Sequence, residues 1–101
     1  MSTEYDAVRY LLTEPRIATR TAPYIGDHGF DFGGLAHAAE ALSGGERLLV
    51  RIAEELWSAQ KLAGFWELVR RLDLDNFERV LEALRIARGT NAWSAERKAA
   101  A

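Results

Sequence analysis

Apolar residues recur at intervals of three and four along most of this chain, and this spacing favours a fold built from helices. The longest regular stretch is 46–58, in which one side is apolar and the opposite side is charged. The apolar side consists of Leu48, Leu49, Ile52, Ala53 and Leu56, widened at its edge by Val50 and Trp57. Because this arc covers about half of the helix, we expect the segment to contact at least two other elements and to form the central helix of the fold.

Four further segments carry the same periodicity and are expected to be helices, at 3–12, 35–42, 63–72 and 76–88. In the first of them Tyr5, Val8, Leu11 and Leu12 face inward. Capping boxes are predicted for three helix starts, from Thr3 with Asp6, Ser43 with Glu46, and Asp75 with Glu78. Gly89 is the predicted stop of the last helix.

The stretch 14–34 contains two prolines and four glycines and has no helical period. It is long for a connection inside a small domain, and a short hairpin, a turn of helix and a functional loop are all open interpretations. The predicted fold class is therefore all-α, a compact bundle of four to five short helices with a long irregular loop near residues 14–34.

Length and composition limit the organisation of the chain. Its 101 residues suffice for one domain, which we place at 1–89, with a C-terminal tail at 90–101 that is expected to be partly disordered or a frayed helix. The hydrophobic share of 49% and the charged share of 28% are typical of soluble globular proteins. No apolar run approaches the roughly 20 residues of a membrane helix. The start of the chain lacks the features of a secretion signal and there is no cysteine, so a cytoplasmic location is expected.

Residues 42–46 read Leu-Ser-Gly-Gly-Glu, which resembles the signature motif of the ATP-binding cassette ATPases, and the resemblance extends over about a dozen of the 101 residues. In that family the motif lies before a helix whose free amides meet a phosphate. The phosphate-binding loop and the acidic strand that the family also requires are absent from this sequence. We therefore interpret Ser43 and Glu46 as a capping box, with two glycines allowing a tight turn, and expect no ATP hydrolysis.

A second constellation brings both histidines near two carboxylates, and its members are Asp27, His28, Asp31 and His37. Two histidines and a carboxylate are a common metal-ligand set, but this spacing matches no metal motif, and turn and cap roles explain the aspartates. Neither a cysteine nor a serine in a nucleophile elbow is present. We expect no metal, no cofactor and no enzymatic activity.

A helix-turn-helix built from 46–58, 63–72 and 76–88 is an alternative interpretation, with the last segment as the recognition helix. Its candidate nucleic-acid contacts are Arg70, Arg71, Asn76, Arg79, Arg85 and Arg88. The charges of the last helix alternate in sign, and the formal net charge of the chain is −2. Both observations disfavour nucleic acid relative to a mixed charged surface.

Aromatic side chains suggest a different partner. Adjacent residues on a helix diverge by about 100°, so Phe65 and Trp66 cannot both point into one core, and Ile86 lies off the apolar side of its helix. Together with Trp93 in the tail, these residues are the candidate interface. The sequence thus predicts a non-enzymatic protein-binding module, either a regulatory factor or an inhibitor that occludes a partner surface, with a homodimer as the commonest arrangement.

Overall fold

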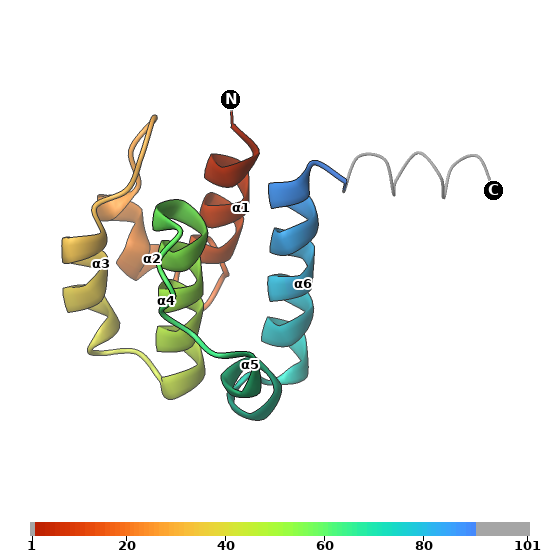
Figure 1. The fold of residues 1–101 in the computed structure, drawn as a ribbon. Coiled ribbons are helices and arrows are strands. Elements are labelled where there is room, and N and C mark those ends of the chain that lie inside the picture. Colours follow the sequence, from red (N-terminus) through yellow and green to blue (C-terminus); the bar gives the residue numbers. More distant parts are fainter. Residues whose placement is uncertain (1, 91–101) are drawn as a thin grey trace.

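Six α-helices and one short 3₁₀ helix make up residues 2–90, the part of the chain that this computed structural model describes (Figure 1). The α-helices are α1 (Thr3–Leu12), α2 (Ala18–Thr21), α3 (Phe32–Ala39), α4 (Gly44–Ser58), α5 (Phe65–Arg71) and α6 (Leu74–Arg88). The 3₁₀ helix η1 spans Ala22–Tyr24. The predicted all-α class is confirmed, with one helix more than the four to five expected. Trp93 and the rest of the predicted tail lie outside the described residues, apart from Thr90.

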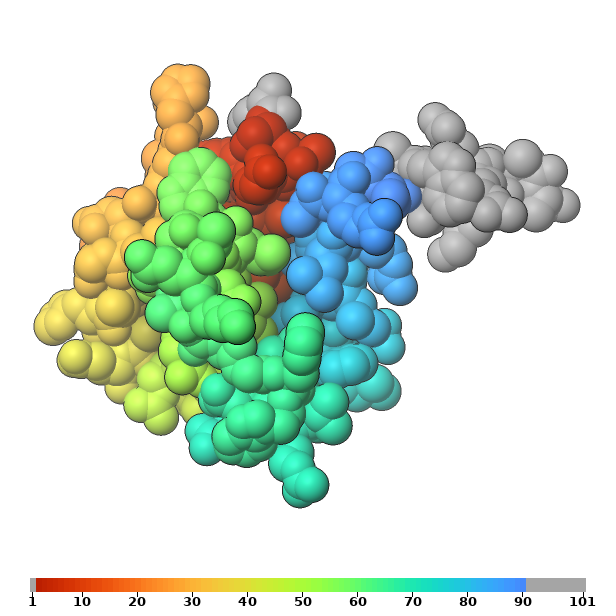
Figure 2. Space-filling model, viewed as in Figure 1, coloured from red at the N-terminus to blue at the C-terminus, as the bar shows by residue number. Residues whose placement is uncertain are grey.

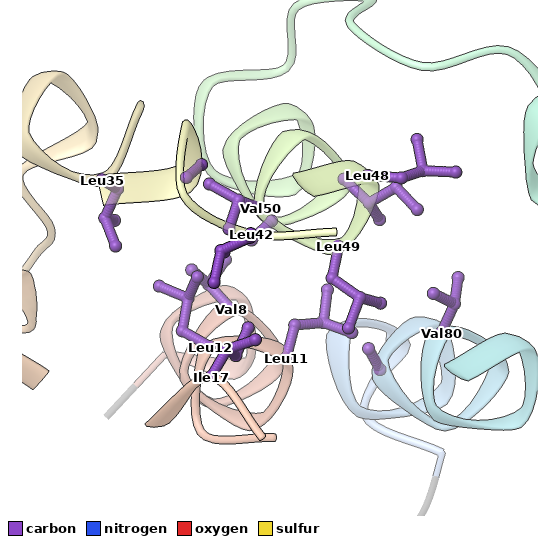
Figure 3. Close-up of a cluster of buried hydrophobic side chains, with 14 of the residues drawn as sticks. Val8, Leu11, Leu12, Ile17, Leu35, Leu42, Leu48, Leu49, Val50 and Val80 are labelled. Atoms are coloured by element: carbon purple, nitrogen blue, oxygen red, sulfur yellow. The ribbon is translucent and has the colours of Figure 1, made fainter. Parts of the chain in front are cut away.

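The core forms where α1, α4 and α6 meet. α1 packs extensively against both α4 and α6, and α3 covers another side of α4 (Figures 1 and 3). Leu11, Leu49 and Val80 come together from these three helices and are fully or almost fully buried (Figure 3). The inward-facing residues predicted for 3–12 are all buried, and those of 46–58 are buried except for Leu56 and Trp57, which are partly exposed.

Helix starts follow capping chemistry at three places. Ser43 and Glu46 form the predicted capping box, with Glu46 N donating to Ser43 Oγ at 3.3 Å and Ser43 N donating to Glu46 Oε1 at 3.1 Å. The predicted cap at Asp75 is wrong, because Asp73 accepts the bond from Asn76 N at 2.8 Å and α6 begins two residues earlier. At α1 the cap is Ser2, so Thr3 lies inside the helix.

The stretch 14–34 is ordered by contacts with α1. It contains a turn of helix, α2, and also a hairpin closed by a single antiparallel bridge between Ile25 and Phe30. Thr21 Oγ1 donates to the carbonyl of Leu12, and the Tyr5 hydroxyl donates to the carbonyl of Gly26. These bonds explain why a segment rich in proline and glycine still has a defined path.

Two further features complete that path. The Phe30 ring stacks on Tyr5 at 4.9 Å and meets Trp57 edge-on at 5.1 Å, so Trp57 packs towards the hairpin. Asp31 accepts a hydrogen bond from Gly34 N at 3.0 Å, and α3 therefore starts at Phe32, three residues earlier than predicted.

The side chain of Thr3 donates to the carbonyl of Ala87 at 2.9 Å and joins the start of α1 to the end of α6.

Candidate interaction surface

Helix α5 is short, and only one edge of its apolar side faces the core. Leu68 and Leu72, four positions apart, form that edge, and Leu72 is buried. Phe65 and Val69 have the same spacing at the other edge, and they are 89% and 71% exposed. Trp66 is 58% exposed beside them. Most of the apolar side of the segment 63–72 therefore faces solvent.

The start of α6 extends this exposed apolar area. Leu74, the first residue of the helix, is 73% exposed, and Leu84 three turns later is also exposed. We name Phe65, Trp66, Val69, Leu74 and Leu84 the apolar surface. It lies on α5 and α6, and α5 occupies the lower end of the molecule in Figures 1 and 2.

Ile86 lies elsewhere. It is half-buried and packs against the core, although its sequence position places it off the expected apolar side of the helix. The reason is that α6 turns Val80 and Ala83 towards α1 and α4, which brings Ile86 inward and leaves Leu84 outside. Ile86 is thus separate from Phe65 and Trp66. Val69, Leu74 and Leu84 were absent from the sequence-based interface, although the four-residue spacing of Phe65 and Val69, next to Leu68 and Leu72 on the helix, was a signal for the first of them.

A small hollow opens beside Phe65, between α4, α5 and α6. Its volume is about 90 Å³. It is lined by Ile52, Glu55, Leu56, Ala63, Phe65, Leu68, Val80 and Leu84. Since seven of these eight side chains are apolar, the hollow is suited to an apolar side chain of another molecule.

Two carboxylates hold α5 in position against α4. Glu55 Oε1 accepts hydrogen bonds from the backbone amides of Leu62 and Ala63, at 2.9 and 3.0 Å. Glu67 Oε2 accepts a hydrogen bond from Arg51 Nη2 at 2.6 Å, and Glu67 Oε1 accepts one from the backbone amide of Gly64 at 3.3 Å. The bond from Arg51 lowers the pKa of Glu67, and the Gly64 amide lowers it further. The apolar surface is therefore attached to the bundle by specific bonds rather than by a loose connection.

Three of the predicted nucleic-acid contacts border a polar hollow of about 470 Å³. Asn76 is only 4% exposed. Arg79 Nη1 donates to the carbonyl of Tyr10 at 2.7 Å, and its guanidinium lies 4.4 Å from the centre of the Tyr10 ring. Arg85 lies 3.4 Å from Glu82. The same hollow is lined by four carboxylates, Glu14, Asp75, Glu78 and Glu82, and by a third arginine, Arg16, which is paired with Glu14. The carboxylates outnumber the arginines, which is unfavourable for phosphate.

The other three predicted contacts lie apart from this hollow. Arg71 stacks on Trp66, with 5.5 Å from guanidinium carbon to ring centre, and borders a different hollow together with Arg47 and Arg51. Arg70 is exposed on α5, and Arg88 is exposed at the far end of α6. The six residues therefore do not form one basic surface.

The histidines are also separated. His28 lies in the hairpin, whereas His37 is exposed on α3, 3.8 Å from Glu40. Among residues 2–90, no group of three or more histidine and carboxylate side chains has the arrangement of a metal site.

No family model, curated protein or solved structure matches this chain. None of the helices within 2–90 has both the length and the apolar character needed to cross a membrane.

Proposed function

We propose that this chain is a small non-enzymatic protein-binding module that acts through the apolar surface on α5 and α6. Such a module serves as an accessory or regulatory factor, or as an inhibitor that occludes a surface of its partner. The observation that carries the proposal is the exposure of Phe65, at 89%, within a group of exposed apolar neighbours. Contiguous exposed apolar side chains mark interaction sites more often than scattered ones do.

The composition of the surface supports a protein partner. Phenylalanine and tryptophan are enriched in the cores of protein interfaces, and Phe65 and Trp66 both belong to this surface. Arg71, whose guanidinium carbon lies 5.5 Å from the centre of the Trp66 ring, supplies a charged group at its border. A nucleic-acid partner is less well supported, because carboxylates surround Asn76, Arg79 and Arg85 in their hollow.

The test is affinity capture from an extract of the native host with the tagged full-length chain as bait. Val69 is the position to change, because it is 71% exposed and makes no core contact. We expect Val69→Glu to keep its helical circular dichroism and to lose the proteins that the unchanged bait retains, since a buried charge without a counter-ion opposes binding.

The matched control is Ala36→Glu, which adds the same charge at an exposed position of α3. This variant should retain the full set of bound proteins, including a differently tagged copy of the chain itself. Identical capture by the unchanged bait and by Val69→Glu would overturn the proposal, because the apolar surface would then play no part in binding.

A further inference from the structure

We infer that a second copy of this chain covers the α6 part of the apolar surface, with the two α6 helices packed antiparallel across a twofold axis at Leu81. This inference rests on the proposed function, because it names the partner for the same surface. The exposed side of α6, the spacing of its side chains and the distribution of its charges support it.

An incomplete apolar stripe runs along the outer side of α6. Leu74 and Leu81 are seven positions apart, as are Phe77 and Leu84, so each pair lies on one line along the helix. All four are at least partly exposed, although Phe77 also packs against the core, and the neighbouring side of the helix, with Val80 and Ala83, is buried. α6 packs against α1 and α4 within the described part of the chain, and this outer side remains open to another molecule.

Charged side chains of both signs flank the stripe, within the alternating charges of α6. Glu78 lies in the N-terminal half, and Arg85 lies two turns later on the same flank. Asp73 and Asp75 add negative charge at the start of α6, and Arg88 adds positive charge at its end. A parallel neighbour would place Glu78 and Arg85 beside their own copies, whereas an antiparallel copy places Glu78 against Arg85 of the partner subunit.

One axis satisfies both the apolar and the charged positions. In an antiparallel pair centred on Leu81, Phe77 lies opposite Leu84 of the partner subunit, and Glu78 lies opposite Arg85 of the partner subunit. In sequence number, the midpoint of the first pair lies between residues 80 and 81, and that of the second pair lies between residues 81 and 82. Both pairs are therefore compatible with a twofold axis close to residue 81. Phe65 shares the small hollow with Leu84 and therefore borders the same contact.

Such an interface is isologous, so each contact occurs twice. A single substitution that turns one contact repulsive therefore acts at two places in the dimer. Glu78 has no ion pair within residues 2–90, and Arg85 has only the surface pair with Glu82, so either side chain is free to be exchanged without loss of a buried partner.

The test uses three forms of the full chain, unchanged, Glu78→Arg and Arg85→Glu, and measures the mass by light scattering over a range of concentrations. We expect the unchanged chain to show twice its monomer mass of 11.3 kDa. Each variant alone should show the monomer mass, or a dissociation constant raised roughly tenfold, because two attractive contacts become repulsive.

The decisive sample is an equimolar mixture of the two variants. In a mixed dimer both contacts are again between opposite charges, one of them native and one exchanged, so the mixture should regain the dimer mass. Arg20→Glu, at an exposed position of α2, is the control and should dimerise like the unchanged chain. High salt should weaken all of these dimers, because it screens exposed charges.

Three results would overturn the inference: a monomer mass for the unchanged chain at every concentration, variants that dimerise as well as it does, or a mixture that remains monomeric. These failures are distinct from failure of the proposed function. If the chain is monomeric and capture of other proteins still depends on Val69, only the second copy is excluded. If capture does not respond to Val69→Glu while the mass still responds to Glu78→Arg and Arg85→Glu, the α5 part of the surface is excluded and the dimer stands.

Discussion

Gly34 is placed so that it cannot take a larger side chain without moving its surroundings. A Cβ atom at this position would lie 2.3 Å from two ring carbons of Tyr24 and 2.8 Å from Asp31 Oδ2, the carboxylate that caps α3. The contact links the start of α3 to the 3₁₀ helix ten residues earlier. Sequence alone did not indicate this, because nothing local distinguishes Gly34 from Gly33.

Replacement of Gly34 tests this packing. Gly34→Ala should lower the free energy of unfolding by about 1–3 kcal/mol, since an aromatic ring must shift to make room. Gly44→Ala is the control, because a Cβ there meets nothing within 4 Å and the residue already belongs to α4. That variant should be neutral or more stable by up to about 1 kcal/mol. Urea unfolding measures the free energy of unfolding of both variants. Equal values would show that the Tyr24 ring moves aside at little cost in free energy.

Capping residues show which helix starts can be predicted from the local sequence. The box of Ser43 and Glu46 was predicted because both partners lie within four residues and need no distant contact. The cap of α6 was misplaced because aspartate occurs at 73 and at 75, and only the latter has glutamate three residues on. Burial of Leu72 immediately before Asp73 fixes the chain there and favours the earlier start.

At the scale of elements, the attachment of α5 depends on an ion pair with α4. Arg51 holds the pKa of Glu67 below its ordinary value, with help from the Gly64 amide. A lowered pKa in the folded state means that the carboxylate stabilises the fold fully above the unfolded pKa of about 4.3. This contribution is lost as the pH falls through the lower folded pKa.

Glu67→Gln should therefore unfold more easily than the unchanged chain at neutral pH, and the difference between the two should shrink below about pH 4.3. Chemical unfolding at a series of pH values measures this. Glu54→Gln is the matched control, because Glu54 lies on α4 without an ion pair to the described residues. The difference in free energy of unfolding between this variant and the unchanged chain should not shrink below about pH 4.3. A Glu67→Gln curve parallel to the unchanged one would mean that the pair with Arg51 does not stabilise the fold.

The elements themselves were largely predictable, whereas the orientation of α5 was not. Long periodic segments such as 46–58 carry enough repeats to define one apolar side, and that side is buried apart from Leu56 and Trp57. Seven residues give only two turns, and the apolar arc of Phe65, Leu68 and Val69 does not define which of its edges faces the core. Packing of Leu72 into the core selects between them, and this information lies outside the helix.

At the scale of the whole molecule, the distribution of charge separates the two candidate partners. The net charge is −2, and the arginines proposed for nucleic acid are dispersed. Arg79 and Arg85 line one hollow and Arg71 another, whereas Arg70 and Arg88 line neither. We expect the chain to flow through heparin at low salt, and the variant Arg70→Glu with Arg71→Glu to behave in the same way. Retention that falls steeply with salt would instead favour the helix-turn-helix alternative.

The path of the chain through the bundle has a consequence for how the protein is made. α1 packs on α6 about as extensively as on α4, and Thr3 is bonded to Ala87 at the end of α6. During synthesis α1 therefore has α4 as a neighbour before α6 exists, and the described core is complete only once α6 has been made. The contact between α1 and α6 closes a loop of nearly the full described length, and we expect such a long-range contact to form slowly.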